Sequence, residues 1–458
     1  MTDSKSTSDP NGDDGDAADR SGVGRIRLAG FAAAALALIA TTIWDSEKLR
    51  ESVFDGYQSH MPRVVESHPA RIVEIDDASL KKYGPWPWSR LHLARLAEGI
   101  HARGALAIGF DMIFLEADRH SPANIARIYP DLPDRVGRSL ARQTDPDHKF
   151  SQTISRLPIV LARVGHHGKT IDQDRDPAKI PIEASFTGHP APSKLLSFEN
   201  VRTNLPKLDG VAAGHAVING PPDGDGILRR VPLVVMLGGR PTPTLALEVL
   251  RVASNADDYR LETKDDKLVS ITVGKRRIPT DSTGALRLHF SPPLAARSVS
   301  ATSILDNTLQ KDAFRGNVVF IGATALGLED VIATPVVGEA FGVDVHAQLV
   351  ETVLAGQWLQ RPHWARRAEI ILAIVLGLIA ILVLPHLKPR SVILTGGAGI
   401  LVMAGASFMS FTSYGLLLDP LAPAMVSGAA VLSMLCMMFL EADRRRQQLR
   451  EALTEERV

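Results

Sequence analysis

Four uncharged, mostly apolar runs stand out in the pattern of hydrophobic and polar positions along this chain. Each approaches or exceeds the roughly 20 residues that a membrane-spanning helix needs. The first run is the shortest, and it is either a signal anchor or a cleaved signal peptide. The anchor is preferred because residues 40–46 lack a small-x-small cleavage site. The sequence therefore predicts transmembrane helices at residues 28–44, 369–387, 391–414 and 420–440.

Basic residues near the ends of these runs predict how the runs are oriented. They are Arg20, Arg25, Arg27, Lys388, Arg390, Arg444, Arg445 and Arg446. Because Lys and Arg next to a span favour the cytoplasmic side, both termini are expected in the cytoplasm and residues 45–368 outside it. Arg366 and Arg367 oppose this orientation, but they end a long loop, where such charges count less.

The two ends of the chain have different patterns. Residues 1–27 are rich in Asp, Ser and Gly in their first part and have no apolar period, which is typical of a disordered cytoplasmic tail. Residues 441–458 follow the fourth run and favour a helix, because Glu441 and Arg445 are spaced four residues apart. This connector helix is expected to transmit a signal, and no catalytic output domain is expected in this chain. Its signal-transmission candidates are Glu441, Arg444, Arg445 and Arg446.

The long segment between the first two runs has two periodicities, which predicts an α/β domain. A strand at residues 71–76, a helix at residues 89–104 and a buried strand at residues 105–111 have the order of a right-handed βαβ unit. Strands between residues 214 and 290 are expected to be antiparallel, so the sheet is predicted to be mixed. The further elements are strands at residues 227–237, 268–273 and 317–322, and helices at residues 244–253 and 344–355.

Composition narrows the classes of function. The 51 Lys and Arg residues balance the 51 Asp and Glu residues, which argues against a nucleic-acid binder that works through bulk electrostatics. A single Cys excludes a disulfide framework and a zinc site built from several cysteines. The extracytoplasmic domain must therefore be held together by its hydrophobic core, and it is long enough for that.

Three aspartates follow the predicted strands of the βαβ unit. Asp76 and Asp77 come after the first strand, and Asp111 ends the second. Ligands of open α/β sheets bind beyond the carboxyl ends of the strands, where Thr324 is also expected. Converging carboxylates suit a divalent cation such as Mg²⁺ or Ca²⁺, with Asp76 and Asp111 as candidate metal ligands, or they suit a cationic ligand.

A structural interpretation of the same residues is also open. The carboxylates would then cap the backbone amides of residues 86–89 and pair with Arg90, since acidic residues commonly form turns at strand ends. Trp86 and Trp88 lie in this Pro-Trp-Pro-Trp turn. They either form the floor of an aromatic pocket or cover the core beside the start of the helix.

Other polar segments have simpler explanations. Residues 223–226 resemble a calcium loop, but the expected ligand positions are missing, which favours a β-turn. Arg229 and Arg230 after it either bind an anion or, as we prefer, form salt bridges to the facing strand. His166 and His167 are interpreted as part of a solvated loop rather than a metal site, and His346 as a core histidine.

Together these stretches resemble the type 2 CHASE domain, the cyclase/histidine-kinase-associated sensory extracellular domain of bacteria. The resemblance covers residues 45–360 and implies an N-terminal span, an extracytoplasmic sensor, three further spans and a cytoplasmic output. In relatives that output is a nucleotide cyclase, a histidine kinase or a Ser/Thr kinase, and the location is the bacterial plasma membrane. The matching residues are 75–80, 84–90, 108–114, 225–233, 321–327, 334–335 and 342–346, with Asp330.

We therefore expect a membrane sensor that binds an unknown extracytoplasmic signal and passes it to a cytoplasmic kinase or nucleotide cyclase. A homo-oligomer is expected, and no nucleic-acid partner is expected. No cofactor is expected other than a divalent cation. The alternatives are an extracytoplasmic metal-dependent hydrolase that uses the three strand-end aspartates, and a scaffold or truncated remnant of a sensor enzyme. The candidate ligand-binding residues are Asp76, Asp77, Trp86, Trp88, Arg90, Asp111, Thr324 and Asp330.

Overall fold

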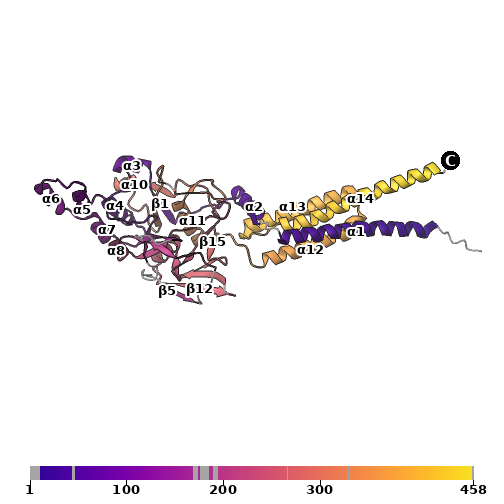
Figure 1. Cartoon of the computed structure of the whole chain (residues 1–458), viewed down its shortest axis with the longest axis horizontal. Helices are drawn as coiled ribbons and strands as arrows, with labels where there is room; N and C mark the ends of the chain where they lie inside the picture. Colours follow the sequence, from indigo (N-terminus) through magenta and orange to yellow (C-terminus); the bar gives the residue numbers. More distant parts are fainter. Residues whose placement is uncertain are drawn as a thin grey trace, which may run out of the picture. The chain divides into compact units, whose positions relative to one another are not determined.

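In the computed structural model the chain forms two compact units. Figure 1 shows the whole chain, coloured from the N-terminus to the C-terminus. The helical unit comprises Met1–Tyr57 and Gln360–Val458, and the α/β unit comprises Gln58–Leu359. The structure describes residues 11–43, 47–168, 174–175, 185–188, 194–265, 267–328 and 330–455.

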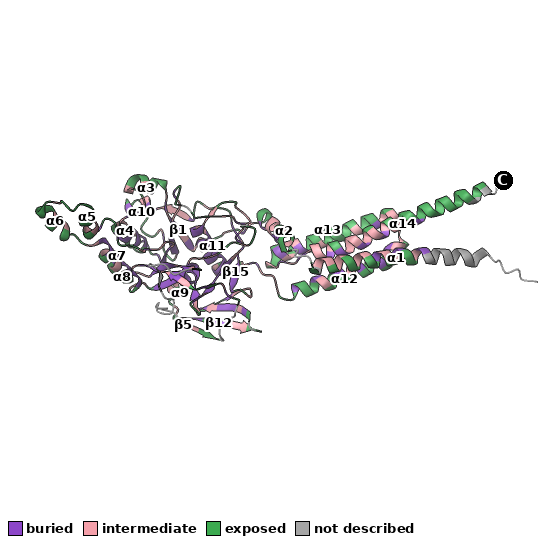
Figure 2. Ribbon diagram, viewed as in Figure 1, coloured by how far each residue is buried: buried purple, intermediate pink, exposed green. Residues whose placement is uncertain are grey.

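The helical unit contains four helices that are long and apolar enough to cross a membrane. Many apolar residues of these helices are exposed, and a lipid environment would cover them. Figure 2 colours the exposed residues of these helices green. The prediction of four transmembrane helices is therefore confirmed by length and composition. The helices are α1 (Asn11–Ile43), α12 (Ala365–Val383, continued by the 3-10 turn Leu384–His386), α13 (Pro389–Tyr414) and α14 (Leu421–Glu455).

The helical unit differs from the predicted pattern at its N-terminal end. Helix α1 begins at Asn11, so much of the segment predicted as a disordered tail is helical. Starting a helix is unfavourable, but once it has formed in the apolar run each further residue adds one backbone hydrogen bond. The helix can therefore continue into a polar sequence. A second helix, α2 (Glu47–His60), follows α1.

The core of the α/β unit is a parallel sheet with the order β16-β1-β17-β2-β3-β8. Strand β17 therefore lies between the two strands of the predicted βαβ unit. The segments β7 (Asn200–Arg202) and β4 (Asp174–Arg175) extend the sheet in antiparallel fashion beyond β3. The parallel strands are β16 (Ser298–Ser300), β1 (Ala70–Ile75), β17 (Val318–Ala323), β2 (Ala107–Phe110), β3 (Ile159–His166) and β8 (Gly214–Val217).

Helices cover both faces of this sheet, which is why its strands are mostly apolar. Alternate residues such as Ile72 and Phe320 pack against α9 (Leu245–Ala253) and α11 (Gly342–Ala355). Their neighbours Val73 and Ile321 face the other way and join the core with α4 (Arg90–His101), α7 (Pro146–Ile154) and α10 (Ala301–Leu305). This alternation is the two-residue period of a strand, and Figure 2 shows α9 and α11, which pack on one face of the sheet, as largely buried.

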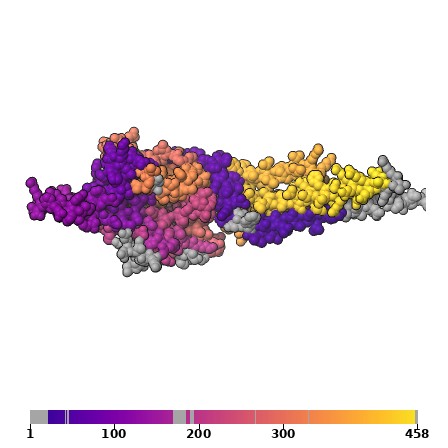
Figure 3. Space-filling model, turned by 45° about the horizontal axis from the view of Figure 1, so that its top comes forward, coloured from indigo at the N-terminus to yellow at the C-terminus, as the bar shows by residue number. Residues whose placement is uncertain are grey.

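Segments that are distant in the sequence meet on the surface of this unit. Figure 3 shows the orange surface of α10 beside the purple surface of α3 (Asp77–Tyr83) and α4. There Lys82 and Tyr83 both donate hydrogen bonds to the Asp306 carboxylate, which follows α10. The segment after β2 contains the short helices α5 (Pro122–Ile128) and α6 (Asp134–Ala141). Another short helix, α8 (Pro206–Asp209), follows β7.

The remaining strands form small, mostly antiparallel sheets, so the predicted mixed α/β fold is confirmed. One sheet has the order β14-β13-β12-β5, another β11-β10-β6, and two are strand pairs, β15-β9 and β18-β19. Their bounds are β5 (Ser185–Gly188), β6 (Ser197–Phe198), β9 (Arg230–Pro232), β10 (Val234–Leu237), β11 (Arg240–Pro243), β12 (Asp258–Lys264), β13 (Lys267–Val273), β14 (Arg276–Pro279), β15 (Ala285–Arg287), β18 (Val331–Ile332) and β19 (Ala340–Phe341).

Candidate functional site

A cavity of about 650 Å³ lies in the α/β unit where the chain leaves the carboxyl ends of β2, β3 and β8. Asp111 follows β2, His167 follows β3 and Asn219 lies just after β8. Asp330 and the first turns of α11 complete one side of the wall. This is the position at which open α/β sheets bind ligands, and the volume is typical of a small-molecule pocket.

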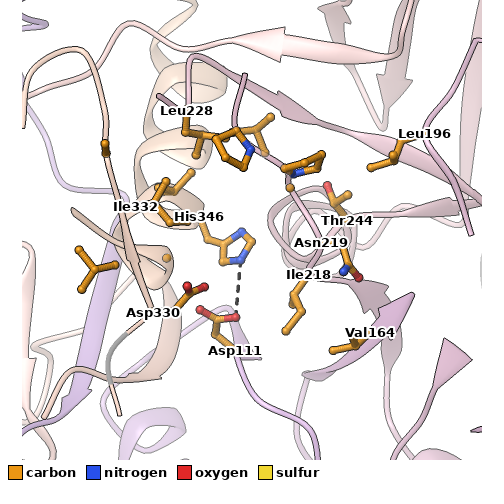
Figure 4. A pocket seen from close by; sticks show the side chains of 18 of the residues that line it. Asp111, Val164, Leu196, Ile218, Asn219, Leu228, Thr244, Asp330, Ile332 and His346 are labelled. Atoms are coloured by element: carbon orange, nitrogen blue, oxygen red, sulfur yellow. Dashed lines mark ion pairs between the residues drawn. The ribbon is translucent and has the colours of Figure 1, made fainter. Parts of the chain in front are cut away.

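Asp111 and His346 form the polar centre of this cavity (Figure 4). The Nε2 atom of His346 lies 3.7 Å from Oδ1 of Asp111, and both side chains are largely buried. The backbone amide of Asp111 donates to the carbonyl of Ile321, which fixes the carboxylate at the end of β2 beside β17. The imidazole of His346 stacks on the ring of Phe320, with centroids 5.9 Å apart. Its position is therefore set by the sheet below it.

The Nδ1 atom of His346 is buried and has no hydrogen-bond partner among the described residues. The whole residue is only 8% exposed. In the neutral imidazole, the carboxylate that faces Nε2 favours the tautomer with its proton on Nε2, and Nδ1 is then an acceptor. A buried acceptor without a donor costs free energy, so this atom has an unused capacity for a hydrogen bond.

Asp330 places a second carboxylate next to Asp111 in Figure 4. Its backbone carbonyl accepts a hydrogen bond from the amide of Gly342, the first residue of α11. A Cβ atom on Gly342 would lie 3.0 Å from Oδ2 of Asp330, so glycine allows the close approach. Partial burial and the negative charge of Asp111 raise the pKa of Asp330, while His346 acts in the opposite direction.

The rest of the cavity wall is predominantly apolar. The described residues that line it include two aspartates and two histidines. They include no lysine or arginine. The Asn219 Oδ1 atom accepts from the Gly165 amide, and the Thr244 hydroxyl donates to the Pro232 carbonyl, so both contribute to the wall itself. The larger apolar side chains are Val164, Leu196, Phe198, Ile218, Leu228 and Ile332.

Asp76 and Asp77 lie outside this cavity. Asp76 caps the N-terminus of α3, where its Oδ1 accepts from the Ser79 amide (2.9 Å) and hydroxyl (2.5 Å) and from the Ser300 hydroxyl (3.0 Å). Asp77 accepts a hydrogen bond from the Leu326 amide. The predicted convergence of Asp76, Asp77 and Asp111 is therefore wrong, because β17 separates β1 from β2. In the described part of the chain, no group of three His, Cys, Asp or Glu side chains could hold a metal ion.

The two tryptophans belong to the core beside α4. Trp88 is 2% exposed and its indole N–H donates to the Gly84 carbonyl. Its ring meets Tyr83 and His92 edge to face, and Trp86 packs next to it. This geometry agrees with the interpretation of a cover over the core rather than the floor of a ligand pocket.

Arg90 and Thr324 also have structural partners. The guanidinium of Arg90 lies over the ring of Phe114 and 3.6 Å from Asp147, whereas its amide donates to Asp118. The structural alternative predicted that Arg90 pairs with the strand-end aspartates. Its observed partners are Asp147 and Asp118 instead. The Thr324 amide donates to the Ile75 carbonyl, and Thr324 does not line the cavity.

The turn at residues 223–226 is held by arginine pairs. Arg229, whose side chain is 1% exposed, pairs with Asp223 and Asp225, and Arg230 lies 3.6 Å from Asp223. These pairs lower the pKa of Asp225 to about 2, chiefly through the hydrogen bond from Arg229. The predicted salt bridges exist, but they join the preceding turn and not the facing strand, since β15 places Arg287 opposite Arg230.

The histidines are placed differently from their predicted roles. His166 ends β3, and His167 packs against Phe198 in the cavity wall. Of the nearby aspartates, Asp172 and Asp176 lie outside the described residues. His346, interpreted from the sequence as a core histidine, is buried but lines the cavity. The signal that could have located it was its spacing from Asp330 and Gly342 in the matched segment.

A buried ion network on α11 had no sequence signal that we recognised. Arg63 donates to Glu351 at 2.8 Å, and Arg297 donates to both oxygens of the same carboxylate at 3.1 and 2.9 Å. Arg297 also donates to Asp344 at 2.7 Å. Two arginines thus balance two carboxylates in the interior. Asp344 and Glu351 are seven residues apart, so they lie on one face of α11, whereas His346 lies on the other.

The predicted signal-transmission residues lie on α14 in the helical unit. Helix α14 continues without a break from its apolar part to Glu455. Glu441 is buried, and its Oε1 atom lies 3.2 Å from Nε of Arg25 on α1. Arg444, Arg445 and Arg446 are exposed. The arginines therefore lie on the surface of α14, and Glu441 joins it to α1.

Comparison with known proteins identifies the family. The model of the CHASE2 domain matches residues 31–383, which is more than half of the chain. None of the curated proteins and none of the solved structures matches. The CHASE2 domain is an extracellular sensory domain and not a catalytic one, and here it is combined with four helices able to cross a membrane. The chain therefore belongs to the CHASE2 domain family and is a multi-pass membrane protein with an extracytoplasmic sensor.

Proposed function

We propose that this protein binds a small molecule in the cavity at the carboxyl edge of its sheet and transmits the binding event through the membrane. The observation that supports this most strongly is the cavity itself, whose polar centre, His346, is part of α11. Helix α11 is the last helix of the α/β unit before the chain enters α12. A ligand that contacts His346 therefore acts on the element that precedes a membrane span.

The ion network offers a physical route for the signal within the α/β unit. It fixes Arg63, near the start of this unit, to Glu351 in the last turns of α11. Both passages of the chain between the two units, before Arg63 and after α11, are thus linked to the same helix. A ligand can shift this helix only if it binds two of its arrangements unequally, and burial of the network makes such arrangements discrete.

Helix α14 is the proposed output. Its continuation carries Arg444, Arg445 and Arg446 beyond the apolar segment, and the positive-inside rule assigns such residues to the cytoplasm. The proposed partner is a cytoplasmic kinase or nucleotide cyclase, or α14 of a second copy of the chain. A rearrangement of α14 would be sensed by that partner.

Ligand binding is tested with the full-length protein in nanodiscs. Its thermal unfolding is followed with a panel of amines, amino acids, sugars and carboxylates. We expect at least one class to raise the unfolding temperature of the wild type, because a ligand that binds only the native state stabilises it. The same compound should have a smaller effect on Ile218→Trp, which fills the cavity. A panel without any effect would overturn the proposal.

Transmission is tested by crosslinking in the native membrane. A tagged full-length chain is crosslinked, and the proteins that co-purify are identified for the wild type and for a variant lacking residues 441–458. We expect a kinase or cyclase, or a second copy, to be lost with the deletion while ligand-induced stabilisation remains. Equal recovery with and without residues 441–458 would contradict the role of α14.

A further inference from the structure

We infer that the cavity takes an organic cation, in which an ammonium group binds between Asp111 and Asp330 and an apolar body fills the rest of the space. This inference rests on the proposed function, since it names the class of molecule that the cavity binds. It goes beyond the family assignment, which identifies a sensory domain without a ligand.

The charges around the cavity are the first argument. Elsewhere in the α/β unit, three buried carboxylates have an arginine partner: Glu351 pairs with Arg297, Glu248 with Arg251 and Asp209 with Arg163. In the cavity two carboxylates face the same space, and the described lining residues include no lysine or arginine. Asp111 is in contact with His346, whose Nε2 atom lies 3.7 Å from Oδ1. A cation from solution would complete the pairing that arginines complete elsewhere.

His346 is the second and independent argument. It is 8% exposed, lines the cavity and has an Nδ1 atom without a hydrogen-bond partner among the described residues. With its proton held toward Asp111, Nδ1 accepts a hydrogen bond. The two carboxylates and, in the neutral imidazole, Nδ1 of His346 therefore offer acceptors on the same side of the cavity. An ammonium group is a donor only, so its chemistry is complementary to theirs.

The apolar wall decides between an organic and an inorganic cation. Leu196, Phe198, Ile218 and Ile332 line the space beyond the aspartates, and a small hydrated ion would leave them in contact with water. Burial of an apolar body against them is favourable because it removes apolar surface from water. The absence of a three-ligand metal group among the described residues agrees with this choice.

The test uses the full-length protein in nanodiscs and three matched series of probes. Hexyl, cyclohexyl and 2-phenylethyl ammonium ions are compared with the alcohols and the carboxylates that have the same bodies, and with MgCl₂ and CaCl₂. Thermal unfolding and calorimetric titration report binding. The variants are Asp111→Asn, Asp330→Asn and Ile332→Trp. Asp257→Asn is the control, because Asp257 is an exposed carboxylate of the same unit that does not line the cavity.

We expect an ammonium ion to bind the wild type and its alcohol and carboxylate counterparts to bind far more weakly. Asp111→Asn and Asp330→Asn should each weaken the ammonium affinity by about tenfold or more, since each removes a charged acceptor. Asp257→Asn should leave the affinity unchanged. Ile332→Trp should reduce binding without a change of charge, which keeps the test valid if an aspartate variant fails to fold.

Three other results would overturn the inference. Equal binding of the alcohols or carboxylates would remove the charge selection while leaving the cavity a ligand site, so the proposed function would survive. Binding of Mg²⁺ or Ca²⁺ that the aspartate variants abolish would assign the site to an inorganic cation. No binding of any organic probe, together with no effect of the wider panel, would overturn both the inference and the proposed function.

Discussion

The ion network on α11 and the cavity beside the same helix treat their carboxylates in opposite ways. Glu351 is surrounded by Arg63 and Arg297, and its side chain is 1% exposed. Asp330 is only partly buried and faces a second carboxylate, and both effects raise its pKa. The first arrangement stabilises one conformation of the fold. The second leaves charge uncompensated at a position where a molecule from solution can enter.

The first prediction removes the central charge of the network. Glu351→Gln leaves Arg63 and Arg297 buried with one carboxylate fewer, and breaking a buried ion pair costs about 3–5 kcal/mol. Chemical denaturation of the full-length protein should show this loss in the free energy of unfolding of the α/β unit. Glu66→Gln, at an exposed glutamate, is the control. A loss as small as that of the control would show that the network does not stabilise the fold.

The second prediction concerns Asp76, a half-buried carboxylate that caps the N-terminus of α3. Asp76→Ala removes an N-cap and should cost about 1 kcal/mol of stability. Asp76→Asn keeps an acceptor for the Ser79 amide and should cost less. Ligand affinity should be the same in both variants. Loss of binding in Asp76→Asn with an intact fold would return Asp76 to the candidate site.

The third prediction concerns Asp330 near neutral pH. Without ligand, Asp330→Asn should leave the unfolding temperature unchanged or raise it slightly, because the variant removes the repulsion by Asp111. Thermal unfolding of the ligand-free protein measures this effect. A destabilisation similar to that of Glu351→Gln would mean that Asp330 has a structural partner. Asp330 would then stabilise the fold as Glu351 does.

The fourth prediction is the pH dependence of the difference in stability between Asp330→Asn and the wild type. The pKa of Asp330 is raised in the folded protein, so its protonated form adds stability that is complete below the pKa of the unfolded chain. This contribution is lost as the pH rises through the folded pKa. The Asn variant should therefore gain stability relative to the wild type over that interval. The groups that face Asp330 are Asp111 after β2 and His346 on α11, and His167 lines the same cavity. Unfolding measured between pH 3 and 7 tests the direction, and a gain of the wild type with rising pH would contradict it.

The candidate site was predictable only in part. Of the predicted ligand-binding candidates, Asp111 and Asp330 line the cavity; Asp111 was chosen from its place at a strand end and Asp330 from the family resemblance. Asp76 and Asp77 have the same strand-end signal but form a cap and a loop contact instead. An aspartate after a strand is equally suited to both roles, so only its neighbours distinguish them. His346 was interpreted as a core histidine because its apolar helix gave no local signal, and its spacing from Asp330 and Gly342 was not used.

Local sequence patterns by themselves determined the four apolar helices, the strands β1, β2 and β17, and the helices α4, α9 and α11, because periodicity reports which faces of an element are buried. The mixed α/β fold follows from their order. Only the tertiary structure decided that β17 enters between β1 and β2, that Arg63 reaches Glu351, and that Asp111, Asp330 and His346 share one cavity. These are contacts between residues far apart in the chain, and the free energy that selects them comes from packing and charge pairing that no local pattern encodes.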